Sequence, residues 1–270
     1  MQLSVVIITY NEEANIGRTL ASLKPFLHDL RGEPAGGEVI VVDSGSTDRT
    51  VEIARSFGAT VYIEEWKGFA AQKNSAIDKA KGRWLLSLDA DEEVSSALGS
   101  EVLKQIARQG MLRTEKPPDS PVFVNGFSMP RRNMFLHRWI SHGGFWPDRK
   151  VRLFRKGKGR FVARPVHESA QVDGSVGDLI SPLIHHSYPT LSDYIEHMNR
   201  YSSLGAEMVV AQGKVRFSFI NIVLRPMFTF IYNYFFRLGF LDGREGLLLH
   251  LYHAVYVSWK YAKAWELSHK

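Results

Sequence analysis

The sequence predicts an α/β protein whose core is an open, mostly parallel sheet with helices on both faces. Between residues 3 and 89, apolar runs of strand length alternate with helical patterns, so that the series reads βαβαβαβ. This alternation is typical of parallel sheets, in which helices connect successive strands. Three polar clusters follow strands of the series. Because ligands bind beyond the carboxyl ends of the strands in such sheets, we expect the clusters to meet at one ligand site.

The first expected strand is Leu3–Thr9, a continuous apolar run that suits a parallel strand covered on both faces. Tyr10-Asn11-Glu12-Glu13 follows it directly. A helical pattern then runs through Ile16, Leu20 and Leu23. The first polar cluster is therefore expected at the carboxyl end of this strand.

The second expected strand, Glu38–Val42, ends in Asp43-Ser44-Gly45-Ser46-Thr47-Asp48. Ser46 or Thr47 is expected to cap the next helix, because hydroxyl side chains accept from the first free N–H groups of a helix. The apolar face of that helix contains Val51, Ala54 and Phe57. A short strand over Thr60–Ile63 and a helix over Phe69–Ala80 follow.

The fourth strand, Trp84–Leu88, leads into four carboxylates, those of Asp89, Asp91, Glu92 and Glu93. Residues i and i+2 of an extended chain point the same way, so Asp89 and Asp91 can converge on one ligand. Carboxylates without cysteine or a nearby histidine favour Mg²⁺ or Mn²⁺. The alternative is an acidic loop that opens a helix over Ser95–Arg108, where carboxylates suit the positive N-terminus.

The composition limits the other expectations. The chain of 270 residues has no cysteine, which suits a reducing cytoplasm, and we recognise no signal peptide. Its net charge of +6 is concentrated between Arg131 and Arg164, with eleven Lys/Arg against Asp148 alone. This bias indicates attraction to an anion such as a ligand diphosphate, an anionic lipid or a phosphorylated glycolipid, and a solvated basic face is the alternative. No nucleic-acid-binding motif accompanies it, so nucleic acid is not an expected partner. The segment Arg113–Pro121, with three prolines, is expected to be an exposed loop.

The C-terminal residues 216–270 differ from the rest in composition. Residues 217–265 hold 14 of the 32 aromatic residues. Phe217–Phe236 is apolar, but Arg225-Pro226 divides it into pieces shorter than the roughly 18–20 residues that a membrane span needs. Leu247–Trp265 is apolar with histidines and lysines spread through it. We expect helices that lie in a bilayer interface, and packing against the preceding domain or a dimer partner is the alternative.

Three blocks carry a family resemblance: Thr9-Tyr10-Asn11-Glu12, Val42–Asp48, and Asp89-Ala90-Asp91. In order and spacing they resemble the nucleotide-sugar signature of family 2 glycosyltransferases, which have the GT-A fold. Further blocks, Trp146–Arg155, Val166-His167-Glu168 and Gly239-Phe240-Leu241-Asp242-Gly243, resemble the bacterial lipopolysaccharide-core β-1,4-glucosyltransferase branch. The signature matches extend over about residues 3–170, with a looser likeness to the end.

The resemblance implies roles for individual residues. The residues expected to bind the donor are Thr9, Tyr10, Glu12, Asp43, Lys73, Asp89 and Arg152. Tyr10 would flank the base and Asp43 would accept from a uracil N3–H, although a turn before a helix also explains Asp43. Asp91 is the expected metal ligand, with Asp89 and Glu93 completing the site. Lys73 is equally well explained as an exposed lysine, and Arg149, Arg152 and Arg155 are candidates for binding phosphate.

Inverting sugar transfer requires the acceptor hydroxyl to lose its proton to a base. The candidates are Glu168, which follows an expected strand over Arg160–Val166, and Asp148. Glu168 is preferred because it belongs to the His-Glu block. For His167 beside it, a structural role is preferred to an approach to the metal or the diphosphate. His185 and His186 are given no role.

The sequence therefore predicts a GT-A catalytic domain over residues 1–215, with a donor half near 1–110 and an acceptor half near 120–215, and a helical tail over 216–270. The expected enzyme is inverting and metal-dependent, and it transfers glucose from a UDP-sugar to a lipopolysaccharide core or another glycolipid at the inner face of the bacterial inner membrane. The alternatives are transfer to a polyprenyl phosphate and a non-catalytic, membrane-docked nucleotide-binding protein. An oxidoreductase is disfavoured because no Gly-x-Gly-x-x-Gly follows the first strand.

Overall fold

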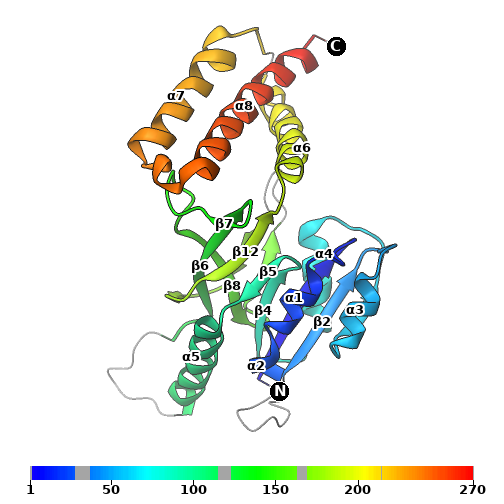
Figure 1. The fold of residues 1–270 in the computed structure, drawn as a ribbon. Coiled ribbons are helices and arrows are strands. Elements are labelled where there is room, and N and C mark those ends of the chain that lie inside the picture. The colour runs from blue at the N-terminus through cyan, green and yellow to red at the C-terminus, as the bar shows by residue number, and fades with distance from the viewer. Residues whose placement is uncertain (1, 28–36, 115–122, 163–168, 214, 270) are drawn as a thin grey trace. The chain divides into compact units, whose positions relative to one another are not determined.

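The computed structural model describes residues 2–27, 37–114, 123–162, 169–213 and 215–269 (Figure 1). The chain forms two compact units. The first comprises Met1–Arg131, Arg149–Arg164 and Glu168–His185, and the second comprises Arg132–Asp148, Pro165–His167 and His186–Lys270.

The predicted parallel series forms the N-terminal half of the sheet. Its strands are β1 (Leu3–Thr9), β2 (Glu38–Asp43), β3 (Thr60–Ile63) and β4 (Trp84–Asp89), in the spatial order β3-β2-β1-β4 with every pair parallel. The helices between them are α1 (Ile16–Ala21), α2 (Lys24–Leu27), α3 (Thr50–Ser56) and α4 (Phe69–Lys79). The central strands are buried because Val, Ile and Leu side chains on both faces of the sheet pack against these helices. The predicted fold class is confirmed.

Later strands extend this sheet in the order β4-β8-β6-β12-β5, and β4 pairs antiparallel with β8. The remaining strands of the described chain are β5 (Glu92–Val94), β6 (Gly126–Phe135), β7 (Arg138–Trp139), β8 (Asp148–Arg155), β9 (Gly159–Val162), β10 (Ser169–Val172), β11 (Val176–Asp178) and β12 (Leu183–Tyr188). Strand β5 was not predicted. It forms because the acidic run continues as an extended chain whose Val94 is buried and pairs with Leu183 of β12. Helix α5 (Ser96–Thr114) follows and is longer than predicted.

The second unit is mainly helical. It contains α6 (Leu191–Val210), the π-helical turns η1 (Ile220–Leu224) and η2 (Tyr232–Phe236) on either side of α7 (Arg225–Ile231), the 3₁₀ turn η3 (Gly239–Asp242), and α8 (Gly243–Leu267). Helix α8 packs against both α6 and α7 (Figure 1). The division into a catalytic domain and a tail near residue 215 stays a prediction. In the structure, α6, which precedes this boundary, packs against α8, which follows it. None of the helices that the structure describes is long and apolar enough to cross a membrane.

The buried carboxylate of Asp242 connects the tail to the Ser141-His142 segment of the second unit. Asp242 accepts the backbone N–H groups of Ser141 and His142 at 3.2 and 2.9 Å, and the His142 Nδ1 at 2.9 Å. Burial would raise the pKa of Asp242, but these bonds hold it below its ordinary value. The Gly239–Gly243 block of the sequence is therefore explained by a structural role in this unit.

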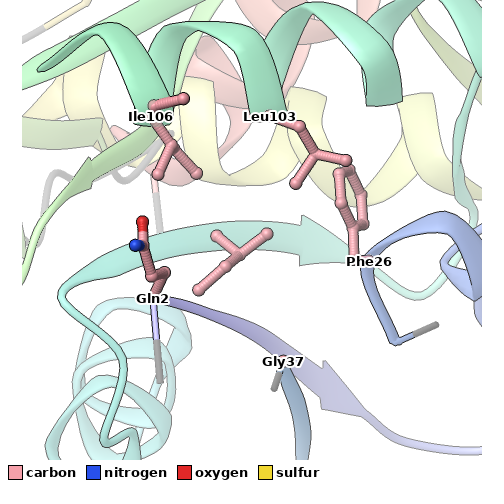
Figure 2. A pocket seen from close by; sticks show the side chains of 7 residues that line it. Gln2, Phe26, Gly37, Leu103 and Ile106 are labelled. Atoms are coloured by element: carbon pink, nitrogen blue, oxygen red, sulfur yellow. The ribbon is translucent and has the colours of Figure 1, made fainter. Parts of the chain in front are cut away.

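A pocket of about 230 Å³ lies at the amino ends of the strands, opposite the predicted ligand site (Figure 2). Its lining is mainly apolar: Leu3 begins β1 and Gln2 precedes it, Gly37 precedes β2, and Leu103 and Ile106 come from α5 (Figure 2). Among the residues that the structure describes, none of those lining the pocket has a titratable side chain. The polar clusters of the predicted ligand site lie at the other, carboxyl ends of the strands.

Candidate functional site at the carboxyl ends of the strands

The carboxyl ends of β1, β2 and β4 bring the predicted clusters to one edge of the first unit. Thr9 pairs with Asp43 across β1 and β2, and Ile8 pairs with Asp89 across β1 and β4. Tyr10 follows β1 and is 57% exposed, so its ring is accessible to a ligand. The predicted convergence of the polar clusters is therefore what the sheet register produces.

Asp43 organises the loop that follows β2. Its Oδ1 accepts the N–H groups of Gly45 and Ser46 at 3.0 and 2.8 Å, and its Oδ2 accepts the hydroxyls of Thr9 and Ser46 at 2.7 and 2.6 Å. Gly45 has a φ of +88°, which glycine adopts without strain. Four donors thus surround a carboxylate that is fully buried. Its contact with a uracil N3–H stays a prediction, and that contact would require one of these donors to move away.

The loops after β1 and β2 bind each other through reciprocal hydrogen bonds. Asn11 donates its N–H to the Ser46 hydroxyl at 2.8 Å, and its side-chain oxygen accepts the Thr47 N–H at 2.9 Å. Glu13 donates its N–H to Asp48 at 3.1 Å and accepts the N–H of Arg49 at 3.0 Å. These bonds fix the two loops relative to each other beneath the exposed Tyr10.

The predicted helix cap at Ser46 or Thr47 is wrong. Helix α3 begins after Arg49, with no capping side chain on that residue. The Ser46 hydroxyl is used by Asp43, and Asp48 accepts the N–H and the hydroxyl of Thr50 instead, at 3.0 and 2.5 Å. A carboxylate at this point satisfies an orphan N–H of the first turn and suits the positive end of the helix.

A buried network of charges supports the acidic run after β4. Asp89 accepts from Lys73 at 2.7 Å through Oδ1 and from Arg152 through Oδ2. The Arg152 guanidinium also reaches Glu92 at 2.6 Å, and Glu92 accepts in addition from Arg131 at 3.3 Å and from the Asp89 N–H at 2.9 Å. Glu92 is fully buried, and only 3% and 5% of Lys73 and Arg152 are exposed. Each charge is paired, as burial requires.

The network sets the protonation of its members. Burial would raise the pKa of Asp89, but Arg152 and Lys73 hold it well below its usual range. Burial would likewise lower the pKa of Arg152, and Asp89 and Glu92 raise it instead. Asp89 is therefore an anion at neutral pH. Lys73 is not an exposed lysine, and the Arg152 guanidinium is already engaged by two carboxylates.

Asp91 forms an ion pair with His185 of β12. The Asp91 Oδ2 and the His185 Nε2 lie 3.2 Å apart. Burial would raise the pKa of Asp91, and His185 lowers it below the ordinary value. Nearby, Glu12 accepts from Asn15 at 2.9 Å, and burial together with the charges of Asp91, Asp48 and Asp89 raises its pKa. Sequence reasoning gave no role to His185, because 94 positions separate it from Asp91 and only the β5–β12 pairing brings them together.

The Asp91–His185 contact is an ion pair, and its two donor atoms are also of the kinds that bind divalent cations. Two neighbouring ligands of an octahedral ion at 2.0–2.1 Å lie about 3 Å apart, which matches the observed separation. The predicted three-carboxylate set of Asp91, Asp89 and Glu93 is not assembled: within the described ranges, no group of three or more His, Asp or Glu residues is arranged to hold a metal. Asp89 is held by Lys73 and Arg152 instead, and Glu93 pairs with Ile184 in the β5–β12 ladder.

The other two candidates for binding phosphate, Arg149 and Arg155, contact side chains of the protein itself. Arg149 contacts Asp178 of β11 at 2.9 Å, and Arg155 stacks on the rings of Trp84 and Phe123 at 4.6 and 4.2 Å. Their planar guanidinium groups suit such stacking and pairing. Much of the basic bias between Arg131 and Arg164 is therefore explained by contacts within the chain.

Of the two candidates for the catalytic base, the structure describes only Asp148. Glu168 and His167 lie outside the described residues. Asp148 is the first residue of β8 and belongs to the second unit, whereas the rest of β8 belongs to the first; its side chain accepts from the Asn133 side chain at 3.2 Å. The choice between Glu168 and Asp148 stays a prediction. The predicted strand over Arg160–Val166 is observed as β9 over its described part, and the predicted loop Arg113–Pro121 lies outside the described residues except for Arg113 and Thr114, which belong to α5.

Comparison with known proteins decides the family. Residues 4–112 match the family model described as Glycosyl transferase family 2. The chain is 30% identical over 273 residues to the lipopolysaccharide core biosynthesis glycosyltransferase LpsC of Rhizobium meliloti, and the match covers 98% of this chain and 93% of the relative. The chain belongs to glycosyltransferase family 2. The predicted family and the assignment as an enzyme are confirmed, and its mixed sheet is that of the GT-A fold.

Two further matches are to a glycosyltransferase sequence and to a solved structure. An uncharacterized glycosyltransferase of Rickettsia bellii is 31% identical, with 99% of this chain and 87% of the relative covered. Among solved structures, the mannosyltransferase PcManGT from Pyrobaculum calidifontis, in complex with GDP-Man and Mn²⁺, is 17% identical with a TM-score of 0.49. That match covers 99% of this chain and 85% of the neighbour.

Replacing Glu92 tests the buried network. Glu92→Gln removes the charge that pairs with Arg152 in a fully buried position, and breaking such a pair costs about 3–5 kcal/mol. We expect urea unfolding to show a loss of that size. The control is Glu52→Gln, which breaks an ion pair with Arg49 whose two side chains are 68% and 69% exposed, and this should leave the unfolding curve nearly unchanged because water screens exposed pairs. Equal, small losses for both variants would contradict the network.

Proposed function

We propose that this family 2 glycosyltransferase transfers glucose, with inversion, from UDP-glucose to a lipopolysaccharide core or another glycolipid acceptor. The observation that carries the proposal is the rim at the carboxyl ends of β1, β2 and β4. There an accessible Tyr10, the loop ordered by Asp43 and the Asp91–His185 pair lie in one compact unit of a family 2 chain. The long similarity to a lipopolysaccharide core glycosyltransferase supports this class of acceptor.

The donor half would be read by the loops after β1 and β2. Tyr10 offers an exposed aromatic face on which a base can stack. Asp43 and Thr9 hold the neighbouring backbone in place, so that N–H groups and side chains of both loops are preorganised for the nucleoside. Glu12, whose pKa is raised, lies close enough to Asp91 and Asp89 to feel their charges and to accept or donate a hydrogen bond at the same rim.

A divalent cation, Mg²⁺ or Mn²⁺, would be held by Asp91 and His185, with Asp89 contributing charge from its place in the network. When bound, such an ion neutralises the charge that develops on the departing diphosphate. Lys73, which contacts Asp89, adds a fixed positive charge beside the same carboxylate and lowers the cost of bringing a second anion to the rim. Arg152 orients Asp89 and Glu92 and thereby the loop that carries Asp91.

The acceptor hydroxyl would be activated by Glu168 or Asp148, acting as general base on the face of the sugar opposite the diphosphate. A lipid-borne acceptor places the enzyme at the cytoplasmic face of the inner membrane as a peripheral protein. Transfer to a polyprenyl phosphate is the second candidate, because that acceptor is already ionised and needs no base.

Removing Asp91 tests the proposed cation site. Asp91→Ala should abolish transfer, with a fall of at least about 10³-fold in kcat/KM, because the diphosphate then departs without charge neutralisation. UDP release from UDP-glucose in Mn²⁺ measures this. The control, Asp173→Ala, breaks an exposed pair with Lys158 and should keep full activity. Full activity of Asp91→Ala in a chelator would end the metal-site proposal.

Isosteric replacement of the two carboxylates decides the base. Glu168→Gln keeps the shape but cannot accept a proton, so turnover should fall about 10²–10⁴-fold with donor affinity nearly unchanged. Single-turnover kinetics and donor titration separate the two quantities. If Asp148→Asn behaves this way instead, the two roles are exchanged. If neither variant slows transfer, the polyprenyl phosphate becomes the better acceptor.

A further inference from the structure

The helical segment before η3 carries exposed apolar residues in a regular pattern. Five adjacent pairs recur every four residues, and every member is at least 37% exposed. We call these ten residues the period-four face: Phe219, Ile220, Val223, Leu224, Met227, Phe228, Ile231, Tyr232, Phe235 and Phe236. Exposed apolar side chains scattered singly are normal on a protein surface, but ten in a continuous pattern indicate a binding surface.

The helix geometry keeps these pairs on one side. In a plain α-helix a repeat of four residues would drift by about 40° per repeat, because each residue turns the chain by 100°. Two of the three parts of this segment are π-helical, η1 and η2, and their i→i+5 hydrogen bonds place more residues in each turn. Pro226 sits at the start of α7, directly after η1, so it does not divide the segment as the sequence suggested. The segment from residue 219 to 236 is continuous, roughly 26 Å long.

The intervening positions face the rest of the tail. Ile222 accepts from the Ser258 hydroxyl of α8 through its carbonyl at 2.8 Å, and Tyr234 packs its ring 6.2 Å from that of His250. Pro226 between them is buried. One side of the segment is thus fixed on α8, and the period-four face is the side that α8 leaves uncovered.

The charge along this segment has one sign. Between residues 214 and 241 the sequence holds Lys214, Arg216, Arg225 and Arg237, and no Asp or Glu. The three arginines are exposed. Arg225 packs against Tyr261 and Arg237 against Tyr232, so their stems follow the aromatic surface while their charges stay at its edge. This arrangement suits an anionic, apolar partner.

We propose that the period-four face is the surface by which this enzyme docks on an anionic lipid bilayer, with the helix lying in the plane of the interface. The proposal rests on the proposed function, since a glycolipid acceptor lies in such a surface. Aromatic and aliphatic side chains would enter the acyl boundary, and the flanking arginines would contact the head groups. A second copy of the chain is the less favoured occupant, because pairing two such faces brings arginines together without any acid in the segment.

Vesicle sedimentation tests the proposal with the full chain. The probe is vesicles of phosphatidylcholine mixed with phosphatidylglycerol, with phosphatidylcholine alone for comparison. The wild-type protein should sediment with the anionic vesicles and less with the neutral ones, and high salt should release it only partly, because apolar burial is not screened. Phe228→Ser combined with Phe236→Ser, at side chains 65% and 74% exposed, should lower the bound fraction at least about tenfold.

The matched control replaces exposed leucines of α8 in the same unit. Leu247→Ser with Leu251→Ser, at residues 41% and 46% exposed, should leave the bound fraction within about twofold of wild type. A wild-type protein that stays in the supernatant, or equal losses in both double variants, would overturn the proposal. So would a dimer in light scattering without vesicles that only the phenylalanine variant converts to a monomer.

A thermal-shift titration with UDP-glucose on the same proteins separates this proposal from the proposed function. Donor binding should be equal in wild type and both double variants, because the substitutions lie in the second unit and the donor residues in the first. If none of the proteins binds the donor while the vesicle result holds, the proposed function fails and the docking surface stands.

Discussion

The contact on which the site depends is the pairing of the buried Arg152 guanidinium with Asp89 and Glu92. Arg152 belongs to β8 and the two carboxylates flank the turn between β4 and β5, so one guanidinium fixes an acidic turn that would otherwise repel itself. Lys73 and Arg131 complete the compensation of charge. Replacing such a network by apolar residues is often neutral for stability. A requirement for ordered carboxylates at this rim accounts for its presence better than stability does.

The neighbouring loops are ordered by hydrogen bonds of their own. With Asp89 held by cations, Asp91 is left to face His185, and the loops after β1 and β2 are fixed by Asn11, Glu13 and Asp43. Sites that transfer charged groups gain most from donors and charges that are already in place when the ligand arrives. The rim meets that requirement where Asp43 and Asp89 are each held by several hydrogen bonds or ion pairs.

Much of this arrangement could be predicted from the sequence, for reasons that are local. The strand runs Leu3–Thr9 and Trp84–Leu88 are apolar throughout, and parallel pairing then places Asp43 and Asp89 at one edge. The partners of those residues could not be predicted, because pairing with Lys73, Arg152 or His185 depends on contacts between distant segments. The short strand β5 was missed for the same reason: three residues, two of them acidic, carry no strand signal, and only pairing with β12 makes them extended.

The structure of the tail could also be predicted only in part from the sequence. Its composition indicated an interfacial segment, but a repeat of four matches neither an α-helix nor a strand, and Pro226 suggested a break. The π-helical turns that reconcile the repeat with a single face are a property of the folded segment. Tail and rim thus belong to separate compact units with separate chemistry, one apolar and basic, the other polar and ordered by buried charge.

Calorimetric titration with UDP, in Mn²⁺ and in a chelator, tests most directly whether the ordered rim holds a cation-bound nucleotide. It would be carried out on the wild-type chain and on Asp91→Asn, which keeps the size of the side chain. Mn²⁺ should tighten UDP binding to the wild type by at least about tenfold, equivalent to about 1.4 kcal/mol, and should have no such effect on the variant. Equal tightening in both proteins, or none in the wild type, would contradict the account.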